Sequence, residues 1–138
     1  MRNFLDVDPG AAAPIWRQIE DGMRRQVASG RLASGTSVPS VRDLAKALRV
    51  NPATVSKAYR RLTEAGLLVV RRGEGTFVAD LSSSVLESER QSLLAEGAVT
   101  YIRIAASVGA SRGEAIRGVE SIWDSQRIEG GEGESDDE

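Results

Sequence analysis

Apolar residues recur every three or four positions in the first patterned segment of the chain. This spacing puts them on one face of a helix, which we expect to run from about Pro14 to about Ser29. Proline suits the first turn of a helix, and Gly30 suits a position just past its end. The stripe consists of Ile15, Trp16, Ile19, Met23 and Val27. Residues 1–13 lack such a pattern, and we expect them to form an extended arm.

Two shorter helices are predicted next, joined by a turn of only a few residues. Ser40 is a good N-cap, and Asp43 three positions later resembles a capping box. Asn51 caps the following helix, Pro52 takes its first position, and Gly66 ends it. The inward faces are Val41, Leu44, Ala45 and Leu48 on the earlier helix, and Val55, Ala58, Tyr59 and Leu62 on the later one.

Two β-like runs complete this region. Residues 67–71 and 76–80 flank the sequence Arg-Gly-Glu-Gly, which indicates a hairpin, and Val38 could add one short strand. Helix, helix, tight turn, helix and hairpin in this order predict a winged helix-turn-helix domain over residues 14–80. The expected fold class is therefore mainly α with a small β-hairpin.

A helical pattern resumes near Val85 and continues, with one turn, to about Gln126. Gly97 is a candidate kink within it. Residues 81–128 carry more apolar positions than a single short helical hairpin can bury against itself, so we expect them to form a homodimer interface. Residues 129–138 are charged, Gly-rich and free of apolar side chains, which predicts a disordered acidic tail.

The amino-acid composition limits the catalytic and metal-binding chemistry that the chain can support. The chain of 138 residues has no cysteine and no histidine, which excludes disulfides and thiolate metal sites and removes the commonest general base. We expect no enzyme, no metal and no cofactor. No run approaches the roughly 18 apolar residues that span a bilayer, and the N-terminus lacks the apolar centre of a secretory signal. A cytoplasmic protein without a membrane partner is expected.

Charge is divided unevenly along the chain. The formal net charge is −2, yet residues 1–80 carry an excess of Lys and Arg, and residues 81–138 an excess of Asp and Glu. Such asymmetry suggests that the first part binds an anion. The alternative is an uneven scatter of surface charge.

The chemistry of the third helix and the hairpin favours nucleic acid. The second helix of a helix-turn-helix enters the major groove, where hydrogen-bonding and cationic side chains are needed. Outside its apolar stripe, this helix carries Asn51, Ala53, Thr54, Ser56, Lys57, Arg60 and Arg61. Arg71 and Arg72 at the hairpin would face phosphates, or one of them the minor groove.

Each of these features also has a purely structural interpretation. The cations could form a solvated helix face with Arg60 paired to Glu64, and the glycines at 73 and 75 could serve only the turn. Tyr59, Trp16 and Trp123 are interpreted as packing residues.

Three motifs resemble the winged-helix domain of GntR-type bacterial transcription regulators: ASGRLASGTSVPSVRDLA, VNPATVSKAYRRLTEAGLL and RRGEGTFV. Their resemblance covers residues 14–80. It implies that DNA is contacted by Arg42, Asn51, Thr54, Ser56, Lys57, Arg72, Gly73 and Gly75. One departure is Arg49, where the family commonly has glycine in the turn. The short remainder is similar to the YtrA-type branch, whose C-terminal helical segment mainly dimerises.

We therefore expect a homodimeric, nucleoid-associated regulator that binds a near-palindromic operator and acts as a repressor. The operator, the regulated genes and any small-molecule effector are not legible in the sequence. One alternative is an architectural DNA-binding protein that regulates no gene. Another is a winged helix that binds protein, against which the cationic face of Lys57, Arg60 and Arg61 argues.

Overall fold

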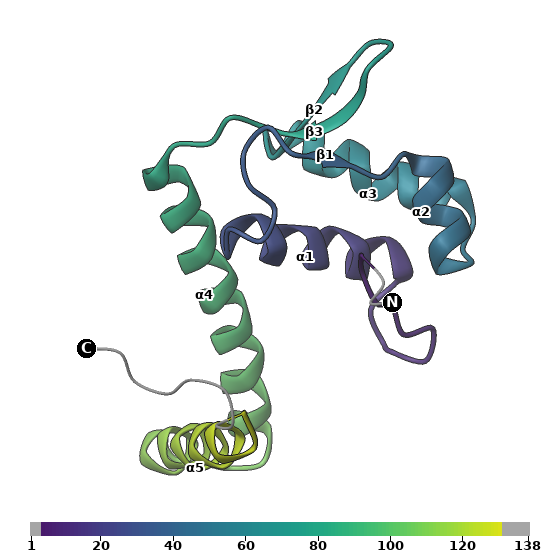
Figure 1. Ribbon diagram of the computed structural model, residues 1–138. Coiled ribbons are helices and arrows are strands. Elements are labelled where there is room, and N and C mark those ends of the chain that lie inside the picture. Colours follow the sequence, from purple (N-terminus) through teal and green to yellow (C-terminus); the bar gives the residue numbers. More distant parts are fainter. Residues whose placement is uncertain (1–3, 131–138) are drawn as a thin grey trace. The chain divides into compact units, whose positions relative to one another are not determined.

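The computed structural model describes residues 4–130, with side chains described up to residue 127. The chain forms two compact units, Met1–Leu93 and Leu94–Glu138. The elements in order are α1 (Ile15–Ala28), β1 (Ser37–Val38), α2 (Val41–Leu48), α3 (Pro52–Glu64), β2 (Leu68–Arg71), β3 (Gly75–Val78), α4 (Ser83–Ser107) and α5 (Arg112–Gly130) (Figure 1). Five helices and one small sheet confirm the expected fold class.

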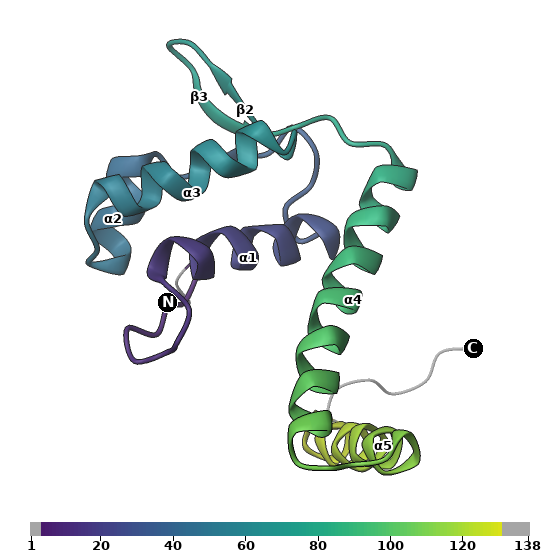
Figure 2. The same cartoon turned by 180° about the vertical axis from the view of Figure 1, so that it is seen from behind.

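The core of the first unit lies between α1, α2, α3 and the sheet. α1 and α3 lie side by side in both views of the molecule (Figures 1 and 2). The inward faces predicted for these helices are the ones that the structure buries. The largest fully buried side chains are Ile19, Met23, Val27, Leu44, Val55, Leu62, Leu68 and Val78. A continuous apolar core therefore fixes the position of α3 within this unit.

The sheet is antiparallel with the strand order β1-β3-β2. Ser37 pairs with Phe77 across β1 and β3, and Arg71 pairs with Gly75 at the tip of the hairpin. The strand that Val38 could add is thus present. β2, β3 and the three-residue loop between them form the wing of the domain.

The N-terminal segment differs from the expected extended arm. Leu5 is only 5% exposed and belongs to the core. Gln26 Nε2 donates a hydrogen bond to the Phe4 carbonyl at 2.6 Å, and Gln18 Nε2 donates one to the Asp8 carbonyl at 2.9 Å. These contacts fold residues 4–13 back on α1, because a few isolated apolar side chains complete the core without any periodic pattern.

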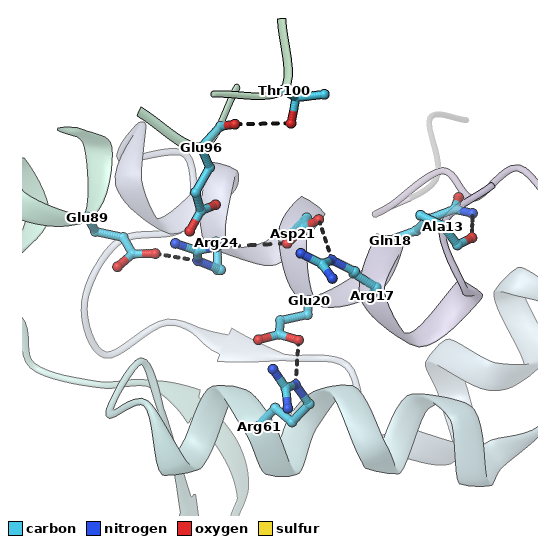
Figure 3. A network of polar contacts seen from close by, with 10 residues as sticks. All are labelled: Ala13, Arg17, Gln18, Glu20, Asp21, Arg24, Arg61, Glu89, Glu96 and Thr100. Carbon is cyan, nitrogen blue, oxygen red and sulfur yellow. Dashed lines mark hydrogen bonds and ion pairs between the residues drawn. The ribbon is translucent and has the colours of Figure 1, made fainter. Parts of the chain in front are cut away.

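The first turns of α4 belong to the first unit by their contacts. Leu86 is partly buried against the core, and Glu89 pairs with Arg24 of α1 (Figure 3). The unit therefore extends to Leu93, beyond the boundary expected after Asp80.

The second unit contains the rest of α4 and α5. α4 continues without a break through Gly97, although this glycine was a candidate site for a kink or a break. The Tyr101 hydroxyl donates to the Ala115 carbonyl at 2.8 Å and thereby joins the two helices. A Cβ at Gly118 would lie 2.7 Å from the Tyr101 oxygen, so a larger residue there would require this hydroxyl to shift. A hydrogen bond of 3.2 Å from the Glu114 amide to Ser111 Oγ caps α5.

α5 continues to Gly130, past the predicted end near Gln126. Residues 131–138, which make up most of the expected acidic tail, lie outside the described residues. Within residues 4–130, no helix combines the length and the apolar composition that crossing a membrane requires.

Candidate nucleic-acid interface

A helix-turn-helix is formed by α2, the turn after it and α3. Ser40 Oγ accepts a hydrogen bond of 3.0 Å from the Asp43 amide, which confirms the predicted cap of α2. Arg49 ends this helix with φ 58° and ψ 47°, the left-handed conformation. It is the one non-glycine residue with positive φ in the described part of the chain. The Val50 amide donates to the Ala45 carbonyl at 3.0 Å, so the turn closes although glycine is absent.

The start of α3 is built by Asn51 and Pro52. Asn51 Oδ1 accepts a hydrogen bond of 2.8 Å from the Ala53 amide, as its predicted capping role requires. Its side-chain oxygen is therefore engaged, while its amide NH₂ group stays available as a donor. Thr54 is half-buried in the next turn, and Ser56 is exposed. The free N–H groups and positive dipole end of α3 add an environment that attracts anions.

Tyr59 belongs to the core side of α3, as predicted. Its hydroxyl donates a hydrogen bond of 2.7 Å to the Pro39 carbonyl, and the residue is 5% exposed. Burial raises the pKa of the Tyr59 phenol, so the group remains neutral and keeps its role as a donor. The contact fixes α3 against the segment that leads into α2.

The exposed cations of α3 have different surroundings. The Lys57 ammonium lies 4.3 Å from the centroid of the Trp16 ring, and the Arg61 guanidinium lies 4.9 Å from the same ring. Arg61 Nε is also 2.8 Å from a carboxylate oxygen of Glu20 on α1 (Figure 3). Arg60 is exposed, and the suggested pair with Glu64 is absent from the described residues. Among residues 4–127, Arg61 therefore has a carboxylate partner, and Lys57 and Arg60 have none.

The wing presents two adjacent arginines. The Arg71 guanidinium stacks 4.6 Å from the centroid of the Phe77 ring, and Arg72 is exposed in the loop. Gly73 and Gly75 have φ of 79° and 123°, so both occupy backbone conformations that disfavour side chains. A Cβ on Gly73 would meet nothing within 4 Å. The tip therefore needs glycine for its backbone and leaves open space in front of it.

Arg42 is exposed in the first turn of α2. Of the basic residues in α2, α3 and the wing, Arg61 alone forms an ion pair within residues 4–130. The carboxylates of the same region, Asp43, Glu64 and Glu74, form no ion pair with these cations in the described part of the chain. The same residues contain no group of three or more His, Cys, Asp or Glu side chains that could hold a metal ion.

Sequence reasoning missed the contacts that Trp16 and Glu20 make with α3. A signal was available: Trp16 and Glu20 are four positions apart on α1, and Lys57 and Arg61 are four positions apart on α3. Side chains with this spacing lie on one face of a helix. The relative placement of the two helices, which joins the pairs, is a property of the fold.

The geometry defines a winged helix-turn-helix domain, and comparison with known proteins identifies the family. Residues 16–78 match the family described as bacterial regulatory proteins, gntR family. The HTH-type transcriptional repressor YtrA of Bacillus subtilis is 33% identical over 93 residues, which are 67% of this chain and 72% of that protein. The HTH-type transcriptional regulator Rv1152 of Mycobacterium tuberculosis is 32% identical over 117 residues, 85% of this chain and 92% of that protein.

A solved structure agrees in fold. A GntR family transcriptional regulator from Listeria monocytogenes superposes with a TM-score of 0.72 at 25% identity, covering 83% of this chain and 98% of its own. The chain belongs to the GntR family, and it resembles the YtrA-like members with a short C-terminal helical part. It is a transcription regulator and not an enzyme.

Proposed function

We propose that this regulator binds double-stranded operator DNA as a homodimer and represses the genes that it controls. α3 would enter the major groove with its N-terminal end towards the base edges, and the wing would lie against the neighbouring backbone. One observation carries the proposal: Lys57, Arg60 and Arg72 are exposed and have no carboxylate partner in the described part of the chain. Phosphates would supply the missing negative charge.

The proposed DNA contacts fall into phosphate contacts, contacts to base edges and close approaches of the backbone. Phosphates are the expected partners of Arg42, Lys57, Arg60, Arg71 and Arg72. Asn51, Thr54 and Ser56 at the start of α3 would address base edges or phosphates. Gly73 and Gly75 would let the backbone of the wing tip approach the duplex closely.

The homodimer is supported by the apolar surface of the second unit. Ile102 is 60% exposed, Ile122 59% and Trp123 65%. An open groove of about 500 Å³ between α4 and α5 is lined by apolar side chains, Tyr101, Ile102, Ala105, Ile116 and Val119 among them. A homodimer that binds a near-palindromic operator would have to present its two α3 helices about 34–36 Å apart, the spacing of successive major-groove half-sites.

The direction of regulation is inferred from a relative, since the Bacillus subtilis protein is named a repressor. A protein that binds operators in the nucleoid would be located in the cytoplasm. No effector is assigned.

The test is selection of bound fragments from the source genome, followed by affinity measurement with the selected duplex. Fragments that share a near-palindromic sequence support a specific operator, whereas binding without a shared sequence indicates an architectural protein. Affinity should fall steeply with salt. Arg42→Ala and Lys57→Ala should weaken binding while circular dichroism stays unchanged. No attraction to any duplex at low ionic strength would overturn the proposal.

A further inference from the structure

Trp16 lies where α1 meets α3, and its ring contacts two cations of α3, Lys57 and Arg61. Its ring is 4.3 Å from the Lys57 ammonium and 4.9 Å from the Arg61 guanidinium. The ring itself is partly buried against the core of the first unit. A rigid aromatic face on α1 is therefore presented to the exposed side chains of α3.

The two cations differ in what else holds them. Glu20 binds Arg61 at 2.8 Å, and the Glu20 side chain is only 15% exposed. That carboxylate cancels the charge of Arg61. Lys57 has no carboxylate partner among the described residues, and an aromatic ring attracts a cation without neutralising it. The contact with Trp16 thus limits the freedom of the Lys57 side chain while leaving its full charge and its N–H donors for another anion.

We propose that Trp16 is a positioning residue for DNA binding, which holds the Lys57 ammonium in place for a phosphate of the duplex. This inference rests on the proposed function. A lysine carries up to about 2 kcal/mol of side-chain conformational entropy, which is lost when it is fixed at an interface. A lysine already restrained in the free protein loses less on binding, so Trp16 raises affinity without touching the DNA. The Glu20 carboxylate is paired with Arg61 at 2.8 Å, and no ion pair joins it to Lys57 in the described residues.

The placement of Lys57 can be measured before DNA is added. The chain has two lysines, Lys57 and Lys46, and the latter is exposed on α2 without an aromatic partner in the described residues. Proton NMR should show the side-chain methylene signals of Lys57 shifted upfield by the indole ring, with Lys46 as the control in the same spectrum. Trp16→Leu should remove the shift. Equal signals for the two lysines in the wild type would overturn the proposal.

The functional test is a double-mutant cycle on the full chain with the selected operator duplex. Trp16→Leu should weaken binding about two- to fivefold, the range of an exposed cation–π contact. Trp16→Phe, which retains a ring face, should recover most of the affinity. In the Lys57→Ala background the effect of Trp16→Leu should vanish, because there is no ammonium left to position.

Arg60→Ala supplies the matched background, since Arg60 is an exposed cation of the same helix without contact to Trp16. In the Arg60→Ala background, Trp16→Leu should still lower the affinity for the operator duplex about two- to fivefold. An equal loss in the Lys57→Ala background would mean that Trp16 only packs, and would overturn the proposal. If Trp16→Leu folds poorly, Trp16→Met, which also lacks a ring, takes its place in the cycle with the same expected loss. Failure of the wild type to bind any duplex is a different result, which overturns the proposed function itself.

Discussion

The two units of this chain differ in how far they bury their apolar side chains. In the first unit, residues such as Ile19, Met23 and Val55 are fully buried. In the second, Ala105 is the one buried hydrophobic residue among those described, while Val108 is 76% exposed and Trp123 65%. Both units are helical and contain apolar positions at helical spacing. The difference lies in the number of elements available to cover them.

Three helices and a sheet enclose a core, whereas two helices leave most of their apolar surface in water. Exposed apolar surface of this extent is typical of a site that another molecule covers. The first unit therefore buries its own apolar side chains, whereas the second would be covered by its partner in the proposed homodimer. The proposal thus assigns assembly and DNA recognition to separate parts of the chain, which substitutions can test independently.

The strongest test of this comparison is to place a charge on the apolar surface of the second unit. Ile102→Asp would bury an unpaired carboxylate in the proposed dimer, at a cost of about 3–5 kcal/mol, so the dissociation constant should rise by about a hundredfold or more. Sedimentation equilibrium measures this change. Val70→Asp is the control, because Val70 is an apolar residue of the first unit that is 67% exposed, against 60% for Ile102. A stable Ile102→Asp dimer would contradict the assignment.

A core substitution in the first unit tests whether this unit is stable without association. Leu62 is 1% exposed, and Leu62→Ala should lower the free energy of unfolding by about 2–5 kcal/mol through lost burial and the cavity left behind. In urea unfolding this loss should be the same at low and high protein concentration. Ile102→Ala should instead act mainly on the dimer dissociation constant. A concentration-dependent loss for Leu62→Ala would show that the first unit is not self-contained.

A substitution of a cation on α3 should have a smaller effect, which should appear in operator binding and not in folding or dimerisation. Lys57→Ala should weaken operator binding about tenfold and lower the slope of log affinity against log salt by about one, because one phosphate contact is lost. The control is the double variant Glu20→Gln with Arg61→Gln, which removes a neutral pair. Its salt slope should equal that of the wild type. A reduced slope in this control would mean that Arg61 also contacts phosphate.

The smallest expected effect concerns the turn of the helix-turn-helix. Arg49 has a left-handed backbone, which disfavours side chains by about 1–2 kcal/mol. Arg49→Gly relieves this strain but adds freedom to the unfolded chain, so a net stabilisation of about 0.5–1 kcal/mol is expected in urea unfolding. Arg60→Gly, the same substitution inside α3, should destabilise by about 1 kcal/mol. Equal signs for the two variants would contradict this account.

Local signals predicted much of the DNA-binding unit. Ser40 and Asn51 cap α2 and α3 as expected, because a capping side chain acts on amides two or three residues away. The hairpin was equally legible, since its two β-like runs flank a glycine-rich loop. The buried Tyr59 followed from the helical period alone.

Features that depend on tertiary contacts were not predictable. Leu5 joins the core as an isolated apolar residue, which leaves no periodic signal. The contact of Trp16 with Lys57 requires α1 and α3 to be placed first. Gly97 was expected to kink α4, yet a single glycine costs only about 1 kcal/mol in a helix, and the long helix continues through it.

The cap at the head of α3 limits what Asn51 could read in a base sequence. Its Oδ1 atom accepts a hydrogen bond from the Ala53 amide, which leaves the NH₂ group and one remaining lone pair of that oxygen for other partners. Two-point pairing with adenine needs a donor for N7 and an acceptor for the N6 amino group, so in the proposed complex the acceptor would be shared with the cap. If Asn51 contacts a base as proposed, the cap would favour partners that accept hydrogen bonds, such as the N7 and O6 atoms of guanine.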